Sequence, residues 1–282
     1  MIFLKGCMVM LSKYICFFMV LFTGFLLAAN ERTVTIWDLS GGNMYWQDLF
    51  GRVFADGGTT LPQDILVNIA NKTAGEIKNI PPDTIVSDDG MSGWVMPNDC
   101  EKSAYACQAV LLAVGLENPL DDVDTETLKR IYSGRVGDWS RIGGKAGKII
   151  LAGYPEASAV GRVFRKKAMQ QDLLNKEKND ISTLIAPDMI VCNSGDAAAA
   201  LLQTSGSVIA FGGADLAGKA QNKFKILKVN GVYPSRENIL SGKYALAAVH
   251  SVAVSKKSRP AAYQEIVDFL KKSTPAEMIT LK

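Results

Sequence analysis

Apolar and polar residues alternate along short segments of this chain, and small-residue turns or amphipathic stretches follow them. Thr33–Trp37 alternates as a half-buried strand does. Similar patterns predict further strands at residues 65–69, 84–86, 110–116, 149–151, 207–211 and 244–254. Apolar residues at helical spacing predict helices at residues 44–54, 125–132, 159–170 and 196–202. Strands and helices that alternate in this way are typical of an α/β fold with mainly parallel sheets.

The first 29 residues differ from the rest of the chain. Lys5 and Lys13 precede an almost unbroken apolar run, residues 14–29, that ends in small residues. This order is typical of a signal peptide, and the run is shorter than the roughly 20 apolar residues that a membrane-spanning helix needs. No Cys stands just after the run, so we expect no lipid attachment there. We expect cleavage near Ala28 or Ala29 and a mature periplasmic protein; the alternative is a retained membrane anchor.

Composition narrows the classes of function. Hydrophobic residues make up 48% of the chain, which indicates a globular protein. The formal charge of +3 falls to about +1 without residues 1–29, and this near-neutral balance gives no support for binding to nucleic acid or acidic membrane. The remaining length suffices for two modest cores or one large one. Since no Pro-rich linker is present, two lobes would have to be joined by crossing strands. We expect a monomer.

Three cysteines remain after the predicted cleavage. Cys100 and Cys107 are close in sequence, and an oxidising compartment favours a disulfide between them. The alternative is a pair of buried thiols, because neither their spacing nor a nearby His indicates a metal site. Cys192 lies in an apolar run, and we expect it in the core.

The sequence offers little support for an enzyme. His250 is the only histidine, and it lies in an apolar strand-like stretch that favours a structural role. Phosphate-loop, nucleophile-elbow and HExxH zinc motifs are absent. We therefore predict no catalytic residues, no metal ligands and no cofactor.

Three turns between predicted strands and helices are rich in small, hydroxyl and amide residues: Ser40–Asn43, Lys72–Gly75 and Glu156–Ala159. Each turn taken alone is better explained as a plain helix cap, because Ser, Thr and Asn are the usual cap residues. Together they suggest an anion pocket, because strand ends and helix starts of α/β sheets present backbone N–H groups to ligands. Asp88 and Asp89 follow another strand. They suit acid–base chemistry, a cation site or, as composition favours, a solvated turn.

Two long segments resemble the phosphate-binding proteins that supply ABC importers. One contains Asn118-Pro119, Ile131-Tyr132-Ser133-Gly134, Asp138-Trp139 and Gly143-Gly144, and the other contains Gly231-Val232-Tyr233-Pro234 through Glu237-Asn238-Ile239 to Ser241-Gly242-Lys243-Tyr244. Ser205 to Phe211 is similar to a third family segment. These matches occur in the family's order between about residues 110 and 255.

The resemblance implies a two-lobed periplasmic binding protein fold of the second type, with a small oxyanion, first of all phosphate, held in the cleft between the lobes. Residues 31–113 with 245–282 would form the first lobe and residues 114–244 the second. Permease subunits of an ABC importer are the expected partners. The expected ligand-binding residues lie at strand ends and helix starts of both lobes: Ser40, Asn43, Thr73, Asp88, Ser158, Ala159 and Arg162.

The chain departs from the family at the second-lobe motif. Tyr154 stands where phosphate binders have an arginine, and Ala159-Val160 replaces Gly-Thr after Ser158. Losing a charge-assisted contact typically costs about 1.5–3 kcal/mol, which Arg162 would have to compensate by pointing back over the helix start. The departure favours a second hypothesis, a small organic or carboxylate solute. A third is an exported enzyme or signalling lobe of the same fold.

Overall fold

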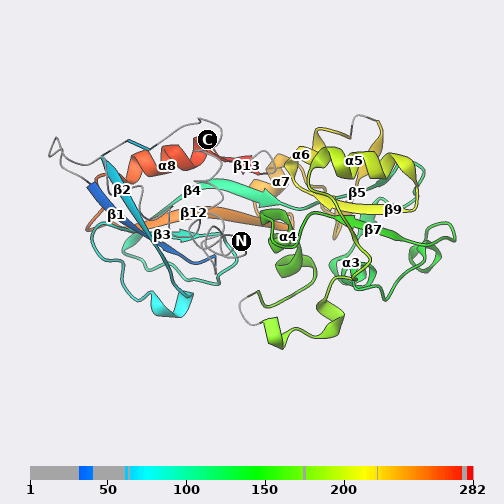
Figure 1. Ribbon diagram of the computed structural model, residues 1–282, viewed down its shortest axis with the longest axis horizontal. Coiled ribbons are helices and arrows are strands. Elements are labelled where there is room, and N and C mark those ends of the chain that lie inside the picture. The colour runs from blue at the N-terminus through cyan, green and yellow to red at the C-terminus, as the bar shows by residue number, and fades with distance from the viewer. Residues whose placement is uncertain are drawn as a thin grey trace, which may run out of the picture.

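The computed structural model describes residues 32–40, 61–62, 64–173, 176–220, 222–274 and 278–281. It has two lobes side by side, each built on one sheet (Figure 1). The predicted signal peptide, the predicted helix at 44–54 and Asn43 lie outside the described residues. Within the described part, no helix has the length and apolar character needed to cross a membrane.

The sheet of the first lobe has six strands among the described residues. Their spatial order is β13 (Ile279–Thr280), β4 (Cys100–Ala109), β12 (Ala247–Ser255), β3 (Thr84–Asp88), β1 (Arg32–Asp38) and β2 (Ile65–Asn71). β1 runs parallel to both β2 and β3, whereas β12 is antiparallel to β3 and β4. Among the described residues, the helices of this lobe are η1 (Ala74–Glu76) and α8 (Tyr263–Lys272). The apolar side of α8 packs on one face of the sheet, where Ile266 and Leu270 join Val252 and Val254 in one buried cluster.

The second lobe is built on a five-stranded sheet. The order is β10 (Phe224–Ile226), β5 (Leu111–Gly115), β9 (Val208–Gly212), β7 (Ile150–Gly153) and β8 (Ile190–Val191), and β6 (Asp122–Val123) pairs separately with β11 (Lys228–Val229). Its helices are α3 (Thr125–Tyr132), η2 (Trp139–Ile142), α4 (Ala159–Val163), η3 (Phe164–Ala168), η4 (Lys176–Lys178), η5 (Ile181–Thr183), α5 (Gly195–Thr204), α6 (Ala214–Ala217) and α7 (Arg236–Leu240). In Figure 1, α5 and α3 lie on opposite sides of this sheet.

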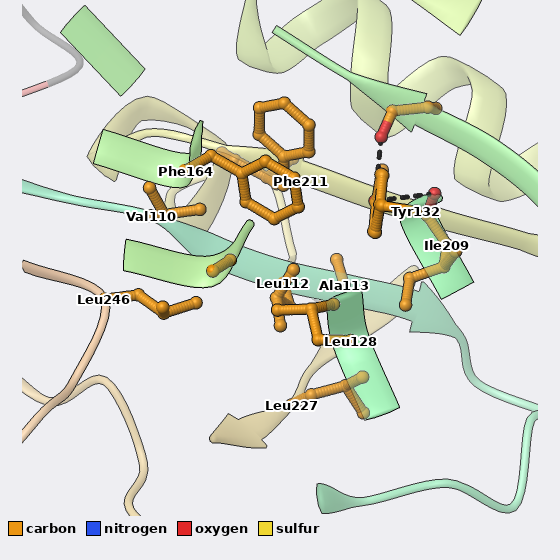
Figure 2. Close-up of a cluster of buried hydrophobic side chains, with 14 of the residues drawn as sticks. Val110, Leu112, Ala113, Leu128, Tyr132, Phe164, Ile209, Phe211, Leu227 and Leu246 are labelled. Carbon is orange, nitrogen blue, oxygen red and sulfur yellow. Dashed lines mark hydrogen bonds between the residues drawn. The ribbon is translucent and has the colours of Figure 1, made fainter. Parts of the chain in front are cut away.

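Three aromatic rings pack against one another in the core of the second lobe (Figure 2). Phe164 stacks on Phe211 with ring centroids 3.9 Å apart, and Tyr132 meets both rings edge-on. The Tyr132 hydroxyl donates to the backbone oxygen atoms of Ala152 and Ile209. This buried hydrogen bonding satisfies the one polar atom of the ring and ties α3 to two neighbouring strands.

The chain passes between the sheets at two adjacent places. β4 ends at Ala109 in the first sheet and β5 begins at Leu111 in the second. The amide of Val110, between them, donates to the oxygen of Leu246, which immediately precedes β12. The two connections are therefore neighbours, as expected of lobes joined by crossing strands.

Most of the elements predicted from hydrophobic patterning are confirmed. They include the strands predicted at residues 33–37, 65–69, 84–86 and 207–211 and the helices at 125–132 and 196–202. The helix predicted at residues 159–170 is regular only through Val163, and a π-helical turn follows to Ala168. The central strand β4 was not predicted, because Glu101 and Lys102 interrupt its apolar pattern.

The predicted disulfide between Cys100 and Cys107 is wrong. Both residues lie on the single strand β4, and both thiols are free and buried. Seven residues of extended strand separate the Cα atoms by roughly 23 Å, whereas a disulfide needs them within about 7 Å. The alternative of two buried thiols holds. Cys192 is also buried in the second-lobe core, as predicted.

Candidate functional site

The first wall of the candidate site is formed by the ends of two parallel strands. β1 ends at Asp38 and β3 at Asp88, and Asp38 lies beside Ser87 in the register of the two strands. The Leu39 amide donates to the Ser87 oxygen over 2.9 Å, so the loops that follow both strands begin at the same sheet edge. This is where α/β sheets bind ligands.

The second wall is the helical segment that follows β7. Ser158 caps the start of α4, accepting a hydrogen bond from the Gly161 amide over 3.0 Å and donating to the Pro155 oxygen over 2.7 Å. A Cβ atom on Gly161 would lie 2.1 Å from the Pro155 oxygen, so only glycine fits there. The close packing fixes the direction in which Arg162 leaves the helix.

A small pocket lies where the two walls meet. Its volume is about 60 Å³, several times the ~10–15 Å³ that a cavity needs to hold one water molecule. The lining residues come from the loops after β1 and β3 and from the segment that begins with α4: Leu39, Ser40, Asp89, Met91, Ser92, Arg162, Lys166 and Leu173. The pocket thus has the size for a small ion.

Arg162 crosses from the second wall to the first. Its Nη2 atom donates to Asp89 Oδ2 over 2.8 Å and also to the backbone oxygen of Ser40. The side chains of this ion pair are only 17% and 6% exposed. The hydrogen bonds to Asp89 and to Ser40 both come from the Nη2 atom, whereas the guanidinium has five N–H donors in all.

Asp88 and Asp89 have different partners although they are adjacent. Asp88 stays within its own lobe: Oδ1 accepts from the Gly90 amide and the Ser92 hydroxyl, and Oδ2 lies 3.8 Å from Lys102 Nζ. Asp89 instead faces the opposite lobe. Both side chains are about 5% exposed, so the solvated turn favoured from composition is wrong: the turn is buried.

Burial is the main influence on the pKa of Asp89, which it raises to about 6. Arg162 and the Met91 amide oppose this shift, and the nearby carboxylates Asp88 and Asp38 add to it. Desolvation therefore outweighs the ion pair. Above pH 6 the Asp89 carboxylate is mostly ionised, and its burial makes this charged form less favourable than it would be in water.

Lys166 adds a second cation to the pocket. It lies one helical turn beyond Arg162 and is half-buried. It makes no ion pair with any residue that the structure describes. The second wall thus presents two cations to the pocket, while the first wall presents one carboxylate.

The structure brings some of the predicted ligand residues together. Ser40 and Arg162 both line the pocket, and Arg162 reaches across the cleft rather than back over its own helix start. Asp88 is next to the pocket residue Asp89. Ser158 uses its hydroxyl to cap α4, and Ala159 follows it.

Thr73 is the remaining predicted ligand residue within the described part of the chain. Its amide and hydroxyl both donate to Glu76 Oε2, at 2.6 and 2.7 Å, in an exposed capping box at the start of η1. Ligand binding by Thr73, Asp88, Ser158 and Ala159, like that by the pocket residues Ser40 and Arg162, stays a prediction.

Sequence reasoning did not assign Asp89, Ser92 or Lys166 to the pocket. The sequence shows that Asp88 and Asp89 are adjacent, but nothing in it says which of the two side chains faces the cleft. Lys166 had a signal that was available: it stands four residues after Arg162, and residues at this spacing share one face of a helix.

Tyr154 lies at the place of the family's arginine, but its hydroxyl is engaged within the second lobe. It donates to Asp215 Oδ2 over 2.6 Å, and the Gly195 amide donates to the same oxygen over 2.7 Å. Tyr154 is not among the residues that line the pocket.

His250 is buried in β12, and burial lowers its pKa to about 3. It is therefore neutral at ordinary pH, which fits the structural role predicted for it. Among the described residues, no group of three or more His, Cys, Asp or Glu side chains is placed to hold a metal ion.

Comparisons with known proteins agree with this architecture. The phosphate-binding protein PstS of Bacillus subtilis is 24% identical over 164 residues, 56% of this chain and 48% of that protein. The match thus spans about half the length of that relative. PstS of Borreliella burgdorferi is 21% identical over 252 residues, 89% of this chain and 78% of that protein.

Solved structures show the same fold. The crystal structure of PstS from Borrelia burgdorferi superposes with a TM-score of 0.61 at 16% identity, covering 89% of this chain and all of that one. An ABC-type phosphate transport receptor from Vibrio cholerae gives a TM-score of 0.56 at 18% identity, covering 84% of this chain and 93% of that one. A family model described as the PBP superfamily domain matches residues 95–271, more than half of the chain. This protein therefore belongs to the PBP superfamily.

Proposed function

We propose that this protein captures phosphate outside the cytoplasm and delivers it to the permease subunits of an ABC importer. The observation that carries the proposal is the pocket between the two lobes, with Arg162 and Lys166 on one wall. The named relatives, which are phosphate-binding proteins, support it. Membership of a superfamily of solute receptors favours a receptor over an enzyme.

The size of the pocket supports a small ion. Pockets for drug-sized organic ligands typically have volumes of about 300–1,000 Å³, far more than the volume of about 60 Å³ here. A phosphate ion fits a space of this order once the walls adjust. A larger organic solute would require the lobes to separate.

The charges support an anion. Among the described residues that line the pocket, Arg162 and Lys166 each carry a positive charge and only Asp89 carries a negative one. A guanidinium binds oxyanions through two parallel N–H groups, a geometry that suits phosphate. Arg162 would thereby compensate for the arginine that Tyr154 replaces.

The lobes would close around the ligand. We infer that the two lobes, predicted as residues 31–113 with 245–282 and as residues 114–244, move as two bodies hinged where Val110 and Leu246 lie side by side. Leu111 and Leu112 already pair with β9 of the second sheet and would move with the second lobe. The importer would then recognise the closed form. Export through a cleaved signal peptide, residues 1–29, would place the monomeric protein in the periplasm.

Calorimetric titration of residues 30–282 tests this function. We expect phosphate to bind and sulfate to bind at least tenfold more weakly, and we expect Arg162→Gln to weaken phosphate binding by about 10- to 100-fold. Arg141→Gln is the matched control, because Arg141 is an exposed arginine of the same lobe. The proposal fails if phosphate does not bind, or if both arginine variants bind it like the wild type.

One observation favours a small carboxylate as the second candidate. Arg162 already accepts a carboxylate partner, Asp89, inside the pocket. Titration with formate, acetate and lactate on the same protein separates the two candidates, since a carboxylate receptor would bind one of these more tightly than phosphate.

A further inference from the structure

The cleft contains an ion pair between the lobes that ligand capture does not require. Asp89 Oδ2 lies 2.8 Å from Arg162 Nη2, and both residues line the pocket. A carboxylate oxygen at hydrogen-bond distance from a guanidinium makes the same contact that an oxygen of a bound oxyanion would make. The first lobe therefore places an anion of its own against the strongest anion-binding group of the second.

The backbone of the first lobe holds Asp89 in this position. Asp89 Oδ1 accepts from the Met91 amide over 3.0 Å. Gly90, between them, has a φ of +74°, and a Cβ atom there would lie 2.7 Å from the Val249 oxygen. At this tight turn Asp88 bonds residues of its own lobe, whereas Asp89 bonds Arg162 across the cleft. The cross-cleft contact is thus built into the turn.

We propose that Asp89 is a tethered competitor: its carboxylate occupies Arg162 until a ligand anion displaces it, and it thereby sets which anions can enter. Where the ligand is phosphate, the inference rests on the function proposed above. A tethered group competes at an effective concentration in the millimolar range or higher. Small monovalent anions such as formate or chloride gain no more from Arg162 than Asp89 does, so they are excluded.

A phosphate dianion can displace Asp89 because it offers more charge and more oxygen atoms. It can bind Arg162 and Lys166 together, whereas Asp89 pairs only with Arg162 among the described cations. Burial already raises the pKa of Asp89, so its ionised form is held less favourably than in water. A dianion can therefore displace Asp89 from Arg162, whereas a monoanion cannot.

The first experiment removes the carboxylate of Asp89 by mutation and supplies a free carboxylate, formate, in solution. We expect sodium formate at 50 mM to raise the melting temperature of Asp89→Ala by several degrees relative to sodium chloride at equal concentration, because formate fills the position that the side chain has left. Wild type and Asp88→Asn should respond equally to the two salts. No formate-specific rise in Asp89→Ala, or the same rise in all three proteins, would overturn the proposal.

The second experiment measures phosphate by calorimetry. We expect Asp89→Asn to bind phosphate about tenfold more tightly than the wild type, and Asp89→Glu, which keeps a carboxylate, to lose most of this gain. Asp88→Asn should give no tightening. Asp89→Ser is measured as a second neutral variant in case Asp89→Asn does not fold. Circular dichroism shows which of the two is folded, and the phosphate affinity of the folded variant decides the outcome.

The two possible failures are distinguishable. If the wild type binds phosphate and the neutral Asp89 variants bind it equally or more weakly, the competitor is refuted and the receptor function stands. If no variant binds phosphate but formate stabilises Asp89→Ala alone, the competitor stands and phosphate is the wrong ligand.

Discussion

The two walls of the cleft differ in charge and in how their groups are held. Asp38, Asp88 and Asp89 stand at strand ends of the first lobe, where bonds within short turns fix them. Arg162 and Lys166 stand on a helical segment that packs on the aromatic core of the second lobe. One wall thus depends on backbone geometry and the other on side-chain packing.

The same opposition extends beyond the pocket. Residues 30–110 and 247–282 taken together contain more acidic than basic residues, whereas residues 111–246 contain more basic than acidic ones. The two lobes therefore carry formal net charges of opposite sign. A ligand anion enters a cleft in which Asp89 already pairs with Arg162, which is the reason that Asp89 matters.

The largest expected effect is on stability, and it comes from disrupting the aromatic core that supports the second wall. Phe164 lies between Arg162 and Lys166 in sequence and stacks on Phe211 at 3.9 Å. We expect Phe164→Ala to lower the free energy of unfolding by about 3–5 kcal/mol, because it leaves a cavity in a fully buried core. Urea denaturation measures the change. Tyr233→Ala, at a half-exposed position of the same lobe, should change stability by less than about 1 kcal/mol.

The next effect is the pH dependence of stability that Asp89 of the first wall causes. The folded-state pKa of Asp89 is raised from 3.8 to about 6, so its contribution to stability is fully present below pH 3.8 and is lost as pH rises through 6. The shift corresponds to roughly 3 kcal/mol. The stability of the wild type relative to Asp89→Asn should therefore fall between pH 4 and pH 7 in denaturation experiments. A difference that stays flat over this range would show that burial does not perturb Asp89.

A third change tests the backbone turn. Gly90 and Gly93 have nearly equal positive φ angles, +74° and +73°, but only Gly90 lies against other backbone atoms. We expect Gly90→Ala to cost roughly 2–3 kcal/mol and Gly93→Ala about 1 kcal/mol, since the latter meets only the conformational penalty. Equal losses in thermal or chemical denaturation would mean that the contact with Val249 relaxes freely.

The smallest effect separates the second lobe's internal bonds from its ligand contacts. Tyr154→Phe removes the hydroxyl that donates to Asp215 and should lower stability by about 1 kcal/mol. Phosphate affinity should stay within twofold of the wild type, because Tyr154 does not line the pocket. A large loss of affinity would place Tyr154 in the binding site after all.

The sequence by itself determined the fold class and much of the element order. Period-two alternation specifies strands such as β1, and a stripe of buried residues such as Leu128 and Ile131 specifies α3. The small-residue turn after the first predicted strand pointed to Ser40, and the loss of the family's arginine pointed to Arg162; both line the pocket. These features are local, so they can be recognised without knowing what lies across the cleft.

Only the tertiary structure decided which acid faces the pocket and which cysteines can meet. Asp88 and Asp89 are adjacent, yet Asp88 bonds Ser92 of its own lobe and Asp89 bonds Arg162 of the other, which composition does not reveal. Cys100 and Cys107 seemed close in sequence, but one extended strand holds them apart. The partner of Arg162 comes from another lobe, 73 residues away in the chain, and a pairing at that distance depends on the packing of both walls.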